Sequence, residues 1–197
     1  MKFFLTKPSK DAIDAILLQE KGKSFSYSEV GATKAKIQAG YAVDHNRIKL
    51  GNGKPTFDKA KLAIQRWTMF QLGWIELCWS KAPIEVGTDV AVLIRYCGLW
   101  SLNASRIVYL IDEKGSPERF GFAYGTLPHH AEKGEERFTV EWNIEDDSVW
   151  YDLLAFSRPN HVLSLLAYPF VRNLQNRFAK DSLAAMVKAV GSAEDTK

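Results

Sequence analysis

Alternation of apolar and polar side chains marks the middle of the chain, from Trp74 to Phe156. In residues 138–144 every second residue is apolar, namely Phe138, Val140, Trp142 and Ile144. Further apolar runs cover residues 74–79, 90–96, 106–111, 119–124 and 149–156, with turn-forming residues between them. Short strands joined by turns rather than by helices predict an antiparallel meander of about six or seven strands.

Apolar residues at helical spacing predict two helices before these strands. The first follows a Ser9 cap and ends at Gly22, and the second follows a Thr56 cap and ends at Gly73. Between the two helices, partial alternation over residues 41–50 predicts a further strand.

A third, longer helix closes the chain. It begins near Pro169, which is compatible with a kink or a first helical turn. At about 20 residues it is about 30 Å long, enough to cover a sheet that native twist has curled. Its apolar face comprises Phe170, Val171, Leu174, Phe178, Met186, Val187 and Val190.

These elements predict an α+β fold in which a curved antiparallel sheet wraps around the C-terminal helix. We expect one domain over residues 1–197, with its core at about residues 25–190 and a flexible tail at residues 191–197.

Composition narrows the class of protein. The chain has 197 residues, 46% hydrophobic and 25% charged, which is typical of a globular domain. Its 26 basic and 23 acidic side chains do not indicate a nucleic-acid partner, and Cys78 and Cys97 lack metal or redox spacing. No long apolar stretch is present, and Lys7 interrupts the apolar start too early for a signal peptide. We therefore expect a cytoplasmic protein without a membrane span.

The order of the elements resembles the helix-grip fold of the START and Bet v 1 (polyketide-cyclase-like) superfamily. In that fold the sheet wraps around the last helix and leaves a cavity between them, so the resemblance implies a cavity here. The segment before Thr56 is longer and more irregular than a minimal helix-grip domain requires.

Four short motifs carry a second resemblance. They are Tyr27-x-x-x-Gly31, Gly121-Phe122-Ala123-Tyr124-Gly125-Thr126-Leu127-Pro128, Gly134-Glu135-Glu136-Arg137-Phe138 and Phe156-Ser157-Arg158-Pro159. They look like the signature of an uncharacterised family, the domain of unknown function nineteen-ninety, over about residues 25–190. The family has no assigned reaction, cofactor or catalytic residue, so this resemblance implies a single-domain unit and leaves function open.

Titratable side chains concentrate in residues 124–137, which we interpret as a loop between two strands. The candidate catalytic residues are His129, His130, Glu135 and Glu136, because histidine and crowded glutamate can exchange protons near neutral pH. The alternative is a solvated turn in which Arg137 pairs with a neighbouring carboxylate. Adjacent histidines point to opposite sides of an extended backbone, and no HExxH spacing is present, so we expect neither metal nor cofactor.

Large aromatic side chains fall on the predicted strands, where they either fill the core or line a cavity. The candidate ligand-binding residues are Trp100, Tyr124, Trp142, Trp150 and Arg158, with Tyr124, His129 and Arg158 as polar contacts at a mouth. The leading hypothesis is therefore a small hydrophobic or amphipathic ligand held between the sheet and the last helix.

Two alternatives stay open. An enzyme of the cyclase, hydratase or hydrolase type would use His129 or His130 as base with Glu135 or Glu136 as partner. A packed domain without a cavity would act through its surface. The sequence does not identify the ligand, the pathway, the oligomeric state or whether the protein is an enzyme.

Overall fold

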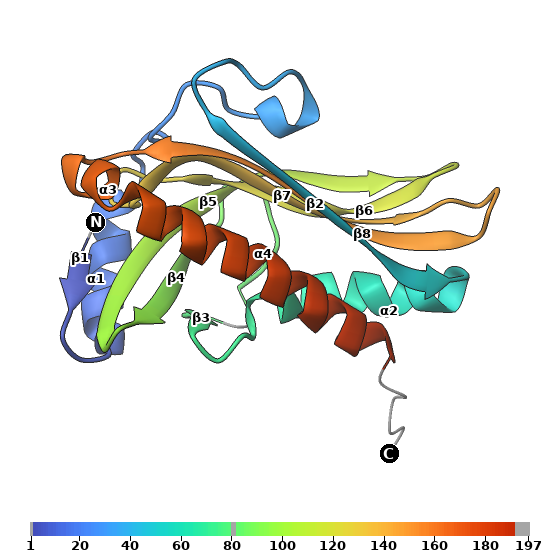
Figure 1. The fold of residues 1–197 in the computed structure, drawn as a ribbon, viewed down its shortest axis with the longest axis horizontal. Coiled ribbons are helices and arrows are strands. Elements are labelled where there is room, and N and C mark those ends of the chain that lie inside the picture. The colour runs from blue at the N-terminus through green and yellow to red at the C-terminus, as the bar shows by residue number, and fades with distance from the viewer. Residues whose placement is uncertain (1, 80–81, 192–197) are drawn as a thin grey trace.

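A curled antiparallel sheet wraps around one face of a long helix in the computed structural model, which describes residues 2–79 and 82–191 (Figure 1). The strands are β1 (Lys2–Phe4), β2 (Ala42–Asn52), β3 (Ile75–Leu77), β4 (Asp89–Tyr96), β5 (Leu99–Glu113), β6 (Glu118–Thr126), β7 (Glu132–Trp142) and β8 (Ser148–Pro159). They pair in the order β2-β8-β7-β6-β5-β4-β3, and β1 pairs with the first residues of β5. The predicted α+β fold and its antiparallel meander are confirmed.

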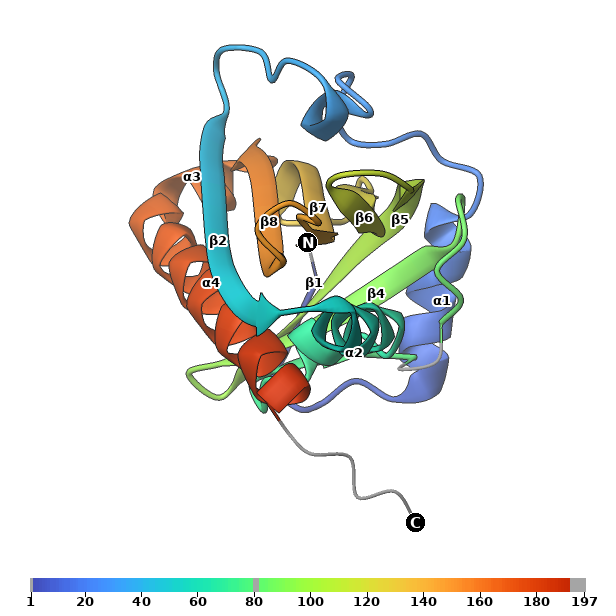
Figure 2. The ribbon, with the colours of Figure 1, turned by 90° about the vertical axis from the view of Figure 1, so that its right-hand side faces the viewer.

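The helices of the described residues are α1 (Lys10–Glu20), α2 (Lys54–Gln65), α3 (Val162–Leu166) and α4 (Tyr168–Gly191), with 3-10 turns η1 (Ala32–Lys34) and η2 (Thr68–Phe70). Helices α2 and α4 lie on the concave side of the sheet, and α1 packs on the opposite side against β4 and β5 (Figure 2). No helix of that part of the chain is long and apolar enough to span a membrane. Of the tail expected at 191–197, the residues after Gly191 lie outside the described residues.

The main core lies between the concave face of the sheet, α2 and α4. Its largest fully buried side chains include Phe57, Trp67, Phe122, Phe138 and Tyr151. A second cluster packs Ile13 and Ile16 of α1 against Ala91, Leu93 and Leu102 on the convex face. The two clusters use opposite faces of the same strands, as alternation of side chains requires.

The sequence predicts how α1, α2 and α4 begin, and the structure agrees for α1 and α4. Ser9 caps α1 as predicted, since its side-chain oxygen accepts from the backbone N–H of Ala12 at 3.3 Å. The predicted Thr56 cap is wrong, because α2 already begins at Lys54 and Thr56 Oγ1 donates to the Asn52 carbonyl at 2.7 Å. Pro169 lies in the first turn of α4, one of its two predicted positions.

Helix α2 ends at Gln65 rather than at the predicted Gly73. Trp67 takes a left-handed backbone conformation (φ 54°), which interrupts the helix. Its ring is buried, and the indole N–H donates to the Ala82 carbonyl at 3.0 Å. Burial of this side chain therefore decides where the helix stops.

Three strands differ from the prediction. Strand β1 was not expected, β5 begins at Leu99 instead of residue 106, and β7 begins at Glu132 instead of residue 138. The unpredicted part of β5 carries Ser101, Asn103 and Ser105 at alternate positions, which breaks an apolar pattern. All three line the concave side of the sheet, where polar residues are not expected in a core strand.

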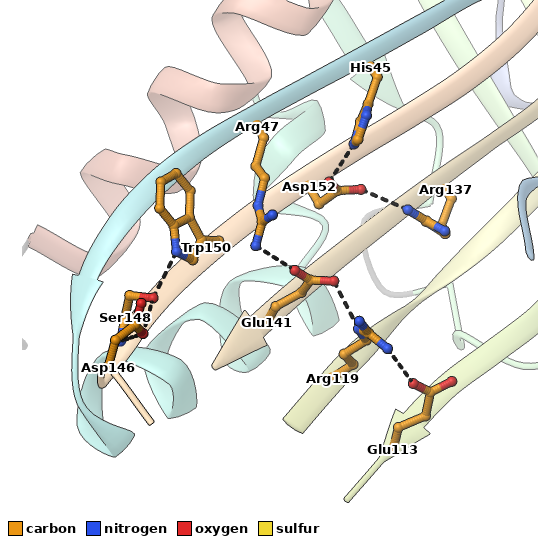
Figure 3. A network of polar contacts seen from close by, with 10 residues as sticks. All are labelled: His45, Arg47, Glu113, Arg119, Arg137, Glu141, Asp146, Ser148, Trp150 and Asp152. Carbon is orange, nitrogen blue, oxygen red and sulfur yellow. Dashed lines mark hydrogen bonds and ion pairs between the residues drawn. The ribbon is translucent and has the colours of Figure 1, made fainter. Parts of the chain in front are cut away.

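The convex face of β2, β8, β7 and β6 carries cross-strand ion pairs and a histidine–carboxylate contact (Figure 3). Asp152 lies 2.6 Å from His45 and 2.8 Å from Arg137, while Glu141 lies 2.7 Å from Arg47 and 2.9 Å from Arg119. Opposite charges on adjacent strands stabilise a sheet face that water can reach.

Substitution of Gly121 tests how closely β6 and β7 approach. A Cβ atom there would lie 2.0 Å from the Phe138 carbonyl oxygen, so Gly121→Ala should lower the free energy of unfolding by about 3 kcal/mol. The measurement is urea unfolding followed by circular dichroism. Gly191→Ala is the control, because nothing lies within 4 Å of its new Cβ atom. Equal stability of the two variants would contradict the close approach of β6 and β7 at Gly121.

Candidate functional site

A cavity of about 430 Å³ lies between the concave face of the sheet and α4. Its aromatic lining residues include Phe70, Trp74, Tyr124, Phe170 and Phe178. Its polar lining residues include Asp44, Asn46, Ser101, Asn103, Ser105, Thr126, His130, Glu132, Glu136, Ser157 and Gln175. A cavity with an apolar region and a few polar groups is the usual form of a small-molecule site.

Strand β7 sends two carboxyl groups into this cavity. Glu132 and Glu136 share a face of the strand with Phe138, and at four residues apart their backbones are separated by about 13 Å. Gly134 lies between them, and a Cβ atom there would lie 1.9 Å from the Phe156 carbonyl oxygen. No side chain therefore separates the two carboxyl groups along the strand.

Glu136 is hydrogen-bonded to an aromatic residue of the cavity wall. The hydroxyl of Tyr124 donates to Glu136 Oε2 at 2.7 Å. Burial raises the pKa of Glu136 to about 7; the hydrogen bond from Tyr124 opposes this effect and the charge of Asp44 adds to it. A carboxyl group with this pKa can give or take a proton at neutral pH.

Glu132 is buried without a hydrogen-bond partner. The residue is 5% exposed, and neither carboxylate oxygen has a hydrogen-bond partner among the described residues. Burial raises its pKa to about 7, opposed by the charge of Arg172. An unpaired buried carboxylate is costly, so this group stores free energy that a partner could release.

His130 lies at the same end of the cavity. Its Nδ1 atom is 3.0 Å from both the backbone nitrogen and the backbone oxygen of Glu132. Burial lowers the pKa of His130 to about 4, so the ring is neutral at pH 7. Of the four predicted catalytic residues, the structure brings His130 and Glu136 to the cavity.

Glu135 directs its carboxylate to the convex side of the sheet, away from the cavity. It accepts from the Tyr27 hydroxyl and the Gly31 backbone N–H, both at 2.7 Å, and from the backbone N–H of Thr33 at 3.1 Å. The carboxylate of Glu135 therefore joins residues 27–34, which we call the η1 segment, to β7. Gly125 belongs to the same cluster, since a Cβ atom there would lie 2.2 Å from the Tyr27 hydroxyl oxygen.

His129 also lies outside the cavity wall and serves the fold. Its Nδ1 atom and its backbone N–H bind the fully buried carboxylate of Glu20, where α1 ends. Burial alone would raise the pKa of Glu20, but hydrogen bonds from His129 and Lys23 together hold it below its usual value. This contact joins α1 to the loop between β6 and β7.

The interpretation of residues 124–137 as a loop is wrong at both ends, because residues 124–126 belong to β6 and residues 132–137 to β7. The alternative of a solvated turn over residues 132–136 is wrong for the same reason. Glu132 and Glu135 are buried, because the strand places them under α4 and under the η1 segment. The expected pairing of Arg137 with a carboxylate does occur, with Asp152.

Tyr124 is the one predicted ligand-binding residue that lines the cavity. Trp100 packs beside α1 on the convex face, Trp150 stacks under Arg47 at 4.8 Å, and Arg158 stacks over the Tyr41 ring at 4.5 Å. Trp142 packs against Phe57 of α2. Strand alternation and the length of the sheet place these four residues elsewhere.

Sequence reasoning missed Glu132 and the aromatic residues that α4 and η2 supply. The parity of Glu132, Glu136, Phe138 and Val140 on one strand could have revealed the inward carboxyl groups. Among residues 2–79 and 82–191, no three His, Cys, Asp or Glu side chains group as metal ligands. Cys78 is a free thiol whose pKa burial raises to about 12, so it is a poor nucleophile.

Residues 26–185 match the family model described as "Domain of unknown function (DUF1990)". The chain belongs to this family. A UPF0548 protein of Dictyostelium discoideum is 38% identical, over 99% of each chain. A UPF0548 protein of Deinococcus radiodurans is 33% identical, over 96% of this chain and 99% of its own. The motifs that carried the resemblance meet in the structure, since Tyr27, Gly31, Gly125 and Glu135 form one cluster.

Solved structures resemble this DUF1990 domain distantly. A hypothetical protein from Helicobacter pylori has a TM-score of 0.49 at 10% identity, covering 84% of this chain and 95% of its own. Norcoclaurine synthase from Thalictrum flavum has a TM-score of 0.46 at 10% identity, covering 81% and 99%. Human STARD10 has a TM-score of 0.44 at 12% identity, covering 94% and 80%. At these values nothing about ligand or reaction passes from those proteins to this one.

The raised pKa of Glu132 predicts a pH-dependent stability. Between pH 4.5 and about 7 the unfolded chain loses this proton while the folded chain keeps it, so the free energy of unfolding falls as pH rises. A shift of this size corresponds to roughly 3 kcal/mol. Glu132→Gln should therefore gain up to about 3 kcal/mol relative to wild type between pH 4 and pH 8, measured by urea unfolding. A constant difference would contradict the burial of an unpaired carboxyl group.

Substitution of Glu135 tests the hydrogen bonds that its carboxylate accepts on the convex side. Glu135→Gln removes a carboxylate that accepts several buried hydrogen bonds, so it should cost about 3 kcal/mol of stability at pH 7. Glu136→Gln, on the other face of the same strand, is the control and should not lower stability, because burial already penalises the charged form of Glu136. Urea unfolding of both variants measures the contrast, and equal losses would mean that Glu135 does not fasten the η1 segment.

Proposed function

We propose that this protein binds a small amphipathic molecule between the sheet and α4. The observation that carries the proposal is the cavity of about 430 Å³, which is lined by several aromatic side chains together with the carboxyl groups of Glu132 and Glu136. The volume lies within the range of about 300–1,000 Å³ that small-molecule sites span. The presence of this cavity counts against the alternative of a packed domain that acts through its surface alone.

The wall gives each half of the ligand a partner. The apolar part would lie against Phe70, Trp74 and Phe178, where burial of apolar surface contributes about 25 cal/mol per Å². The polar part would lie near Asn103 and Glu132, which offer hydrogen-bonding groups. A few polar groups in an otherwise apolar cavity would orient such a ligand.

An enzyme that moves protons is a second candidate, favoured by the two cavity carboxyl groups with pKa values of about 7. The acid–base partner would be Glu136 with the Tyr124 hydroxyl, because Glu135 and His129 are engaged on the convex side and at α1. The test is to incubate the protein with a molecule extracted from it and to follow the molecule by mass spectrometry. Conversion that Glu136→Gln slows by about 100-fold would support the enzyme. An unchanged rate in that variant would exclude this pair.

Filling the cavity should abolish binding without unfolding the protein. Ala155 lines the cavity on β8, and Ala155→Phe places a ring in its open volume. Titration with the neutral fluorophore N-phenyl-1-naphthylamine should show saturable binding to wild type, weakened by about tenfold or more in Ala155→Phe. Trp150→Ala, on the convex face, is the control and should bind as wild type does.

Thermal unfolding of all three proteins checks that the variants are folded. An affinity for the fluorophore that is the same in Ala155→Phe and wild type would place the binding outside the cavity and contradict the proposal.

A further inference from the structure

The charge of the cavity wall is one-sided. Its lining includes Asp44, Glu132, Glu135 and Glu136, whereas none of the described lining residues is lysine or arginine. Glu135 contributes backbone to the wall while its carboxylate binds the η1 segment. Three carboxyl groups therefore remain to set the electrostatic potential inside the cavity.

One of these three is already neutralised. The guanidinium of Arg172 on α4 forms a two-pronged pair with Asp44, with both N–O distances 2.5 Å, and donates to Gln175 at 2.7 Å. Arg172 is close enough to influence Glu132 electrostatically, but none of its hydrogen bonds reaches that carboxylate. Lys133 follows Glu132 on β7, and strand alternation directs it to the other face.

Glu132 thus has no positively charged hydrogen-bond partner among the described residues. Both of its oxygens are buried and lack a partner in the part of the chain that the structure describes. Among the nearby titratable groups, Glu136 lies four residues along the same strand, the ring of His130 is neutral, and burial lowers the pKa of His161, so none of the three adds a positive charge at pH 8. A buried carboxylate becomes favourable when a cation pairs with it and is bound at short range.

We infer that the polar group of the ligand is a protonated amine, which forms an ion pair with the Glu132 carboxylate inside the cavity. The inference rests on the proposed function and specifies the chemical class of the ligand. The aromatic part of the wall suits an aryl or alkyl chain attached to that amine. A ligand with its own carboxylate is disfavoured, because no lysine or arginine in the described lining could bind it.

The experiment compares three ligands that share one apolar body: phenethylamine, phenethyl alcohol and phenylpropionate. Each displaces N-phenyl-1-naphthylamine from the wild-type protein at pH 8, and displacement gives its affinity. The amine should bind about tenfold more tightly than the alcohol, and the acid should bind more weakly than both. In Glu132→Gln the amine should lose this advantage while the alcohol keeps its affinity. Glu145→Gln, an exposed turn residue, is the matched control.

The pH dependence supplies a second readout. Amine binding needs ionised Glu132, whose pKa is about 7, so affinity should rise about tenfold from pH 6 to pH 8. The rise should largely vanish in Glu132→Gln, whereas the affinity of the alcohol should not rise with pH in either protein.

The outcomes separate the inference from the proposal beneath it. If the fluorophore binds but the acid binds as tightly as the amine, or the amine keeps its advantage in Glu132→Gln, the inference is overturned and the cavity remains a binding site. If neither the fluorophore nor any of the three ligands binds, both the inference and the proposed function fail.

Discussion

Strand β7 divides its side chains between two environments, and the rest of the structure depends on that division. On the convex side lie the side chains of Glu135, Arg137 and Glu141, which bind the η1 segment and the neighbouring strands. On the concave side lie the side chains of Glu132, Glu136 and Phe138, which line the cavity or pack in the core. Because side chains alternate strictly along a strand, a shift of one residue would exchange the two sets. Register on this strand therefore decides both the fastening of the fold and the chemistry of the cavity.

Carboxyl groups on the two faces of β7 affect the stability of the fold in opposite directions. On the convex side Glu141 and Asp152 pair with arginines, and Glu135 accepts from three different residues of the η1 segment. On the concave side Glu132 is buried and unpaired, which lowers the stability of the fold near neutral pH. Proteins tolerate such a cost at functional sites, where a ligand supplies the missing partner. The contrast along one strand is the main reason to interpret the cavity as a binding site.

Much of the fold could be predicted from the sequence, because the strands around Phe122 and Phe138 and the helix after Pro169 carry clear periodic patterns. The site was harder to predict. Ser101, Asn103 and Glu132 are polar residues on strands. They interrupt the apolar pattern by which a strand is recognised, so the sequence predicts a loop or turn at these positions. Of the predicted ligand-binding residues Tyr124 does line the cavity, whereas the strand positions of Trp100 and Trp150 direct both to the convex face. Periodicity identifies a strand, but which face of it becomes concave depends on curvature that arises over the whole sheet.

The central claim is that the space between the sheet and α4 holds a small molecule. Its most direct test is native mass spectrometry of the purified protein, followed by organic extraction of whatever it carries. The account predicts an added mass on wild type that Ala155→Phe lacks, and an extract that contains an amphipathic molecule. An identical added mass on both proteins would contradict the claim, because the molecule would then be bound elsewhere.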